Sequence, residues 1–140
     1  MVNKICLLGL VFSLPAANCL FAQTGKTPSS TVYSNAKPRN YVRVWDVLAP
    51  INDPALVMTR PVEDVRMSTS YLDGLGRPLQ SVVREASLEN ATGVKNDVVT
   101  VMEYDAFGRD IYKNMPYPYS ATNGSFKLDG FPQQLSVLNG

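Results

Sequence analysis

The sequence contains no histidine, and its two cysteines, Cys6 and Cys19, lie within the first 22 residues. The lack of histidine removes the commonest general base, a common metal ligand and any Ser-His-Asp triad. Because we expect residues 1–22 to be removed after synthesis, the rest of the chain has no thiol for a disulfide, a cysteine-type zinc site or a cysteine nucleophile. The composition therefore predicts a protein that is not an enzyme and that uses no cofactor or metal.

The sequence also lacks an excess of charge of either sign. Without Lys4, the 13 lysine and arginine side chains become 12, which equals the number of aspartates and glutamates. Nucleic acids and anionic membranes are recognised by clustered basic side chains, which a balanced composition does not favour. We therefore expect no nucleic-acid partner.

Long hydrophobic runs are absent except at the start of the chain. Lys4 is followed by the apolar run "ICLLGLVFSL" and by a break at Pro15, which is the layout of a secretory signal peptide. The run is too short for a stable membrane span. We expect residues 1–22 to be cleaved after Ala22, leaving Gln23 as the new N-terminus and no membrane-spanning segment.

Cys19 offers an alternative to simple secretion. In "LPAANC" it could carry the lipid of a lipoprotein and tether the chain to a membrane. The residue before a lipidated cysteine is usually small, and Asn18 fits that position poorly. Cleavage after Ala22 remains the preferred interpretation.

The remaining chain has the pattern of one small, mostly β domain. Residues 23–40 are polar and aperiodic, which predicts a flexible leader, and residues 41–126 form the expected β domain. Residues 127–140 look like the truncated start of a continuation, with a late strand over 133–138. Little helix is expected, and residues 84–93 are the only plausible helical stretch. Apolar and β-branched residues predict strands at Tyr41–Leu48, Val65–Leu72, Arg77–Glu85, Val98–Tyr104 and Arg109–Lys113.

One short motif occurs twice, with a spacing of 32 residues. Each copy has a tyrosine followed by Asp-x-x-Gly-Arg, and the residues that make up the two copies are Tyr71, Asp73, Gly76, Arg77, Tyr104, Asp105, Gly108 and Arg109. An aspartate at the first position of a turn accepts backbone hydrogen bonds, and a glycine at the fourth supplies a left-handed conformation. Between β-prone runs this predicts two hairpins whose turns end in a glycine bulge. The arginine stem should then lie along the upstream tyrosine of its own hairpin.

Three sharper interpretations of the chain stay open. Asp73 and Asp105 could form a pair of carboxylates for acid–base catalysis, although both occupy turn positions that use their oxygens. The first motif could be a calcium loop, but it lacks the further oxygen ligands that calcium needs. Aromatic side chains could instead line a carbohydrate-binding or adhesion surface, for which the candidates are Tyr41, Trp45, Tyr117 and Tyr119. Ordinary turns and ordinary packing explain all of these residues, and we prefer that interpretation.

The segments "YLDGLGRPLQSV" and "EYDAFGRDIYKNMPY" resemble the tyrosine-aspartate (YD) repeats of the Rhs family of large secreted bacterial proteins. The span from about residue 40 to residue 126 is similar to the N-terminal domain of unknown function that precedes those repeats in many members. The motifs follow the same order: "NYVRVW", "YLDGLGRPLQSVVREAS", "DVVTVMEYDAFGRDIYKNMPY" and "NGSF".

This resemblance implies a non-enzymatic, exported structural module. The repeats of the family wind into a large hollow β shell, which in many members encloses a toxic domain, so the chain would form the start of such a shell. Its partner would be the remainder of a longer YD-repeat chain, and a surface glycan is the alternative partner. The resemblance places the protein outside a Gram-negative-type bacterium or on its surface.

Overall fold

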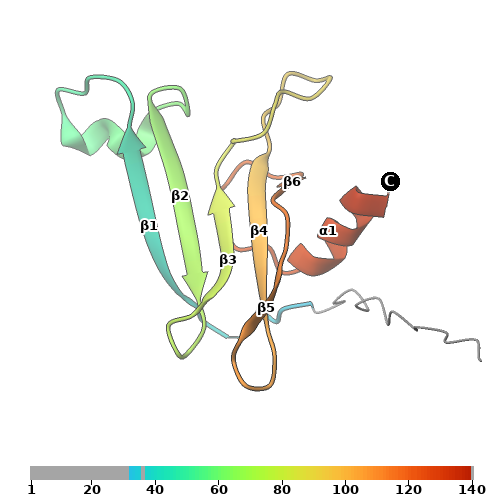
Figure 1. Ribbon diagram of the computed structural model, residues 1–140. Helices are drawn as coiled ribbons and strands as arrows, with labels where there is room; N and C mark the ends of the chain where they lie inside the picture. The colour runs from blue at the N-terminus through green and yellow to red at the C-terminus, as the bar shows by residue number, and fades with distance from the viewer. Residues whose placement is uncertain (1–31, 36, 140) are drawn as a thin grey trace, which may run out of the picture.

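A computed structural model describes residues 32–35 and 37–139. In this part of the chain a six-stranded antiparallel sheet has the order β1-β2-β3-β4-β5, and β6 pairs with β4 beside β5 (Figure 1). The strands are β1 (Asn40–Val47), β2 (Val65–Leu72), β3 (Pro78–Val83), β4 (Asp97–Tyr104), β5 (Asp110–Lys113) and β6 (Tyr117–Tyr119). The helical elements are a 3-10 helix η1 (Pro54–Thr59) and the α-helix α1 (Gly130–Asn139). The prediction of a mostly β fold with little helix is confirmed.

Alternation along β2 and β4 determines which face of the sheet is buried. In β2, Val65, Met67, Thr69 and Tyr71 are buried, whereas the residues between them are only partly buried or exposed. Side chains in a strand alternate between the two faces, so a single buried face follows from this pattern. We call this the inner face of the sheet.

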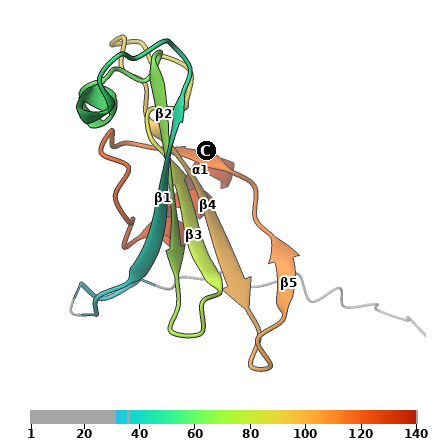
Figure 2. The same cartoon turned by 90° about the vertical axis from the view of Figure 1, so that its left-hand side faces the viewer.

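The core lies between the inner face and the C-terminal part of the chain. The buried residues that form it are Tyr71, Val82, Val99, Val101, Tyr117 and Phe131. Helix α1, which supplies Phe131, packs against β4 and β6. In the view from the β1 edge of the sheet, the chain after β6 loops out on one side of the strands and α1 lies behind them (Figure 2). The C-terminal segment thus completes the core of a domain that the sheet alone would leave open.

Two predictions of secondary structure are wrong. Residues 133–138 were predicted to be a strand but belong to α1, and residues 84–93 form turns and an isolated bridge between Glu89 and Lys95 rather than a helix. The carbonyl of Asp129 accepts the first hydrogen bond of α1, from Gln133 N at 3.0 Å, so Asp129 occupies the N-cap position. Helix α1 therefore begins directly after Asp129.

The described end of the predicted leader packs against the core. Tyr33 donates its backbone N–H to Leu128 O at 2.8 Å, and its ring meets Phe126 edge-on with 5.1 Å between centroids. The guanidinium of Arg39 lies 4.0 Å from the centroid of Phe126. Tyr33 and Arg39, at the end of the predicted leader, thus add to the apolar contacts around Phe126.

The predicted signal peptide (residues 1–22), the cleavage after Ala22 and the lipid site at Cys19 lie outside the described residues. Within residues 32–35 and 37–139, no helix combines the length and the apolar character needed to cross a membrane.

Candidate functional site

The first motif folds as a tight turn between β2 and β3. Asp73 Oδ1 accepts hydrogen bonds from the backbone N–H groups of Leu75 (2.8 Å) and Arg77 (2.9 Å), and Oδ2 accepts one from Arg77 Nε at 2.7 Å. Gly76 has φ +79° and donates its N–H to Asp73 O. Only glycine adopts such a backbone conformation without strain, which explains its position.

The second motif repeats this geometry between β4 and β5. Asp105 Oδ1 accepts from the N–H groups of Phe107 (2.9 Å) and Arg109 (2.8 Å), and Oδ2 accepts from Arg109 Nε at 2.7 Å. Gly108 also has φ +79°. In both hairpins the strand register shifts next to the turn, as expected for a bulge.

The chemistry of the two aspartates favours a turn over acid–base work. Hydrogen bonds from the backbone N–H of Arg77 to Asp73, and of Arg109 to Asp105, hold the pKa of each carboxyl below its usual range, and the guanidinium of the same arginine adds to the effect. Both groups are therefore ionised near neutral pH, where a general acid must carry a proton. Their oxygens are engaged within their own turns.

The two turns are joined by Arg77. Its guanidinium lies 4.5 Å from the ring centroid of Tyr104 in the second motif, and Tyr104 OH donates a hydrogen bond to Pro78 O at 2.8 Å. This corrects the expectation that the arginine stem lies along the tyrosine of its own hairpin. Tyr71 is buried on the inner face, where its ring packs against Tyr41 and Phe126 and its hydroxyl donates to Gly124 O at 3.2 Å.

Substitution of the two turn glycines tests this junction. Gly76 and Gly108 have the same φ, so replacement by alanine strains both backbones alike. A Cβ at Gly76 would meet nothing within 4 Å, whereas a Cβ at Gly108 would lie 2.4 Å from Arg77 Nη1. We expect both to lower the melting temperature, because an L-residue is strained at this φ, and Gly108→Ala to lower it more. Differential scanning calorimetry of both variants measures the difference. Equal losses would show that the Arg77 guanidinium moves aside at little cost, so that its contact with the second turn adds little stability.

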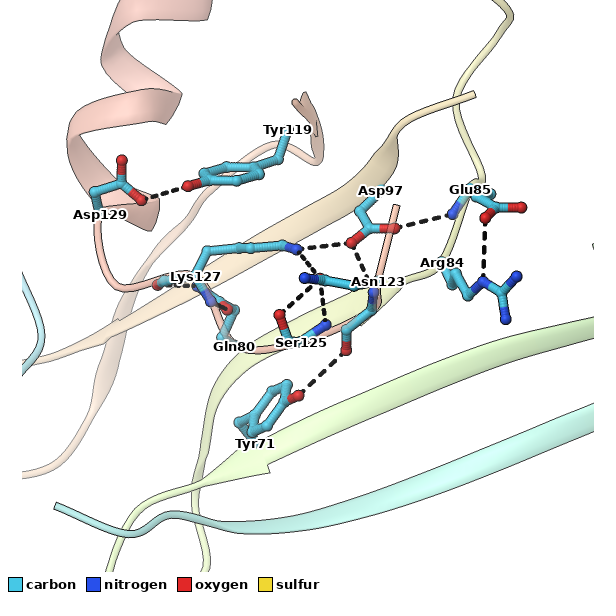
Figure 3. A network of polar contacts seen from close by, with 11 residues as sticks. Tyr71, Gln80, Arg84, Glu85, Asp97, Tyr119, Asn123, Ser125, Lys127 and Asp129 are labelled. Carbon is cyan, nitrogen blue, oxygen red and sulfur yellow. Dashed lines mark hydrogen bonds and ion pairs between the residues drawn. The ribbon is translucent and has the colours of Figure 1, made fainter. Parts of the chain in front are cut away.

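A buried ion pair lies between β4 and the C-terminal segment (Figure 3). Lys127 Nζ donates to Asp97 Oδ2 at 2.7 Å and to Asn123 Oδ1 at 2.9 Å. The side chain of Lys127 is 3% exposed and that of Asp97 is 0% exposed. Asp97 also accepts backbone N–H bonds from Glu85 (3.1 Å) and Gly124 (2.8 Å). Each charge therefore has the multiple partners that burial of an ion requires.

Two neutral side chains tie the same loop to the sheet. Gln80 accepts from Lys127 N at 2.8 Å and donates to Lys127 O at 3.2 Å, as a neighbouring strand would. Tyr71, which lies in β2, donates a hydrogen bond from its hydroxyl to the carbonyl of Gly124. We call the set Tyr71, Gln80, Asp97, Asn123, Gly124 and Lys127 the polar network. It fixes residues 123–127 over the inner face.

Tyr117 and Tyr119 should make the folded protein less stable at alkaline pH. Burial, together with the hydrogen bond from Tyr119 OH to the Asp129 carboxylate (2.7 Å), raises the pKa of Tyr119 to about 12, and burial raises the pKa of Tyr117 far above its ordinary value. A tyrosine whose pKa is raised in the folded state contributes its full stabilisation at a pH below the unfolded pKa of about 10. This contribution is lost as the pH rises from about 10 toward the pKa of the folded state.

We therefore expect the urea midpoint to fall between about pH 10 and pH 12. Tyr119→Phe should make this fall shallower, since the titrating group is removed. Phe107→Leu, at an exposed side chain that carries no titrating group, is the control and should leave the slope unchanged. The same slope in all three proteins would contradict the assignment.

The four aromatic candidates for a carbohydrate surface are not brought together. Tyr117 is buried in the core, 2% exposed, with its hydroxyl donated to Gly130 O, and Tyr119 is bonded to Asp129. Tyr41 and Trp45 lie on β1, and three strands separate β1 from β6 in the sheet. A shared sugar-binding platform of these residues is therefore not formed.

The part of the chain that the structure describes holds no candidate metal site, and a hollow opens on its surface. In the described residues, no group of three histidine, cysteine or carboxylate side chains is placed to hold a metal ion. A surface hollow of about 530 Å³ is lined by residues that include Leu48, Val83, Val98, Glu63 and Lys95. Glu63 and Lys95 pair with each other at 2.6 Å.

The turns were found from the sequence, whereas the polar network was missed. The only available signal was the position of Asp97, which shares the alternation of Val99 and Val101 and so falls on the buried face. A charge at such a position needs a buried partner. The partner, Lys127, lies 30 residues away, and no local pattern identifies it.

Comparisons with known proteins identify one family. No curated protein and no solved structure shows significant similarity to the chain. The model of one family, described as a domain of unknown function (DUF6443), matches residues 43–140, which is most of the chain and includes both turns and the polar network. The chain therefore belongs to the DUF6443 family of domains of unknown function.

Proposed function

We propose that this protein is a non-enzymatic, exported structural module that forms the N-terminal part of a YD-repeat shell protein of the Rhs type. The observation that carries the proposal is the contact between the two turns. Two hairpins of the same motif lie side by side in one sheet, and the arginine of the first stacks on the tyrosine of the second. A unit that contacts its own copy in this way is suited to repetition.

The distribution of charge and hydrogen bonds supports a scaffold. The carboxylates of Asp73 and Asp105 bind their own turns, and the charges of Asp97 and Lys127 neutralise each other. Buried groups with complete sets of partners hold a structure together, whereas a catalytic group must have a position left for substrate.

Detection of the native protein tests the proposal. An antibody against residues 41–126 should detect, in the culture fluid or at the cell surface of the source organism, a polypeptide several times larger than the 15.4 kDa of this chain. A protein of this size alone, retained inside the cell, would contradict both the export and the role in a longer shell.

An aspartate substitution tests the absence of catalysis. Asp105→Asn keeps the shape of the side chain but removes the charge that accepts from Arg109, so we expect a melting temperature lower by a few degrees. Ala106, the next residue in the turn, is exposed, and Ala106→Ser serves as the control. Loss of a measurable hydrolytic activity at unchanged melting temperature would overturn the proposal.

A further inference from the structure

The loop that the polar network holds contains the pair Asn123-Gly124. An asparagine followed by glycine is the pair most prone to deamidation, because glycine has no side chain to hinder attack of its backbone nitrogen on the asparagine amide. The fold nevertheless favours glycine at this position. Gly124 has φ +61°, and a Cβ there would press on the methyl group of Met67 and lie 3.4 Å from Arg84 Cβ. The reactive pair is therefore built into the structure.

Deamidation joins two atoms of this pair and releases a third. The backbone nitrogen of Gly124 attacks Cγ of Asn123, the bond from Cγ to Nδ2 breaks, and Nδ2 leaves as ammonia with the proton of the attacking nitrogen. Water then opens the cyclic imide. Opening at the side-chain carbonyl gives aspartate, whereas opening at the backbone carbonyl gives isoaspartate, whose main chain is longer by one methylene. Because Asn123 is exposed, the ammonia is lost to solvent and the reaction is not reversed.

Both reacting groups are engaged in the folded protein (Figure 3). The N–H of Gly124 donates to the carboxylate of Asp97 at 2.8 Å. Oδ1 of Asn123 accepts hydrogen bonds from Ser125 N at 3.0 Å, from Ser125 Oγ at 2.6 Å and from Lys127 Nζ at 2.9 Å. For attack, the nitrogen must leave Asp97 and the amide must turn toward it, so several hydrogen bonds have to break together.

The groups that hold the pair are themselves fixed. Asp97 and Lys127 are 0% and 3% exposed and contact each other at 2.7 Å. The carbonyl of Gly124 accepts a further hydrogen bond from the hydroxyl of Tyr71 at 3.2 Å. A segment with this many buried contacts opens rarely, whereas an open segment has the freedom of an unfolded chain. The rate of deamidation should therefore follow the opening of residues 123–127.

We propose that Asn123 is a site of deamidation that the polar network protects, so that conversion takes place when residues 123–127 open and then cannot be undone. Isoaspartate at this position would displace Gly124, whose N–H and carbonyl could no longer meet Asp97 and Tyr71 together. Conversion thus weakens the attachment of the C-terminal segment to the sheet. The chemistry is the same whether or not the chain is part of a longer shell protein.

Peptide mapping by mass spectrometry tests the site. The folded protein without its predicted signal peptide, the same protein unfolded in guanidinium chloride, and a peptide of residues 119–128 are incubated at mildly alkaline pH. The mass gained when NH₂ is exchanged for OH at Asn123 is followed over time. We expect the folded protein to convert at least about tenfold more slowly than the other two, since opening of the segment limits the reaction.

Two results would overturn the proposal directly. Conversion in the folded protein as fast as in the peptide, or faster, would show that the network gives no protection. A peptide that does not convert would show that the pair is not reactive. Asn90 is a control within the chain, because its Oδ1 accepts from Thr92 N and Oγ1 as that of Asn123 does from Ser125, but alanine follows it. Comparable conversion at Asn90 would show that the glycine is not what makes the site reactive.

Asp97→Ala frees the N–H of Gly124 and should speed conversion in the folded protein about tenfold or more. Val82→Ala, at a core position that is 0% exposed and outside the polar network, is the control for lost stability. Guanidinium chloride is added to the more stable variant until the two free energies of unfolding are equal. Asp97→Ala should still convert faster, and equal rates would mean that global unfolding, not the network, controls the reaction.

Two further measurements complete the test. If Asp97→Ala does not fold, Tyr71→Phe, which removes only the hydrogen bond to Gly124 O, is compared with Val82→Ala in the same way. Converted protein, separated by ion exchange through its added negative charge, should have a lower urea midpoint than unconverted protein. Equal midpoints would show that the C-terminal segment stays attached after conversion and would overturn that part of the proposal.

Discussion

Replacing Asp97 with alanine is expected to lower the free energy of unfolding by about 3–5 kcal/mol, the scale for breaking one side of a buried ion pair. The ammonium of Lys127 would remain at a position that is 3% exposed, without its carboxylate. The N–H groups of Glu85 and Gly124 would lose their acceptor as well. Urea denaturation followed by circular dichroism measures the loss, which is a large part of the stability of a domain of this size.

Two further variants show whether the charge is responsible. Asp46→Ala, at an exposed aspartate on β1, should change the stability by no more than about 0.5 kcal/mol. The double variant Asp97→Asn/Lys127→Met removes both charges, so it should recover a large share of the loss, since neutral replacement of a buried pair is often tolerated. A loss below about 1 kcal/mol for Asp97→Ala would mean that the pair does not hold the loop.

The ion pair matters because of what it connects. Asp97 begins β4, and Lys127 lies in the segment that leads to α1, which supplies Phe131 to the core. Gln80 and Tyr71 hold the same segment from two other strands. The C-terminal segment is thus attached to the inner face by directional polar bonds next to the apolar contacts. Such bonds select one position of the segment among those that apolar packing alone would allow.

The strands and the turns could be predicted from the sequence because their causes are local. Alternation over Val65–Leu72 places four side chains on a buried face, and Asp73 with Gly76 determines a turn within five residues. Each of these signals depends on neighbours in the chain. The predicted limits of β2 agree with the structure to the residue.

Features that depend on distant residues could not be predicted in the same way. Arg77 stacks on Tyr104 rather than on Tyr71 because β3 and β4 are neighbours in the sheet, which the motif alone does not state. Helix α1 was mistaken for a strand, although Phe131, Leu135 and Leu138 have the i, i+4, i+7 spacing of a helix.

Replacing Gly130 with alanine is expected to lower the free energy of unfolding by about 1–3 kcal/mol through overpacking. A Cβ at this position would lie 2.6 Å from Gln80 Nε2 and 3.0 Å from Val101 Cγ1. Neither neighbour can move freely. The amide of Gln80 is hydrogen-bonded to both the N–H and the carbonyl of Lys127, and Val101 is 1% exposed in the core. The cost should therefore exceed the gain in helix propensity from alanine, which is at most about 1 kcal/mol.

Gly74→Ala is the matched control for this prediction, because a Cβ at Gly74 meets nothing within 4 Å and its φ lies outside the left-handed region. Its stability should be unchanged or raised by up to about 1 kcal/mol, since alanine restricts the unfolded chain. Urea midpoints of the two variants give the comparison. If Gly130→Ala were as stable as Gly74→Ala, the helix would not approach the sheet as closely as its contacts with Gln80 and Val101 require, and the C-terminal segment would be held by the polar network alone.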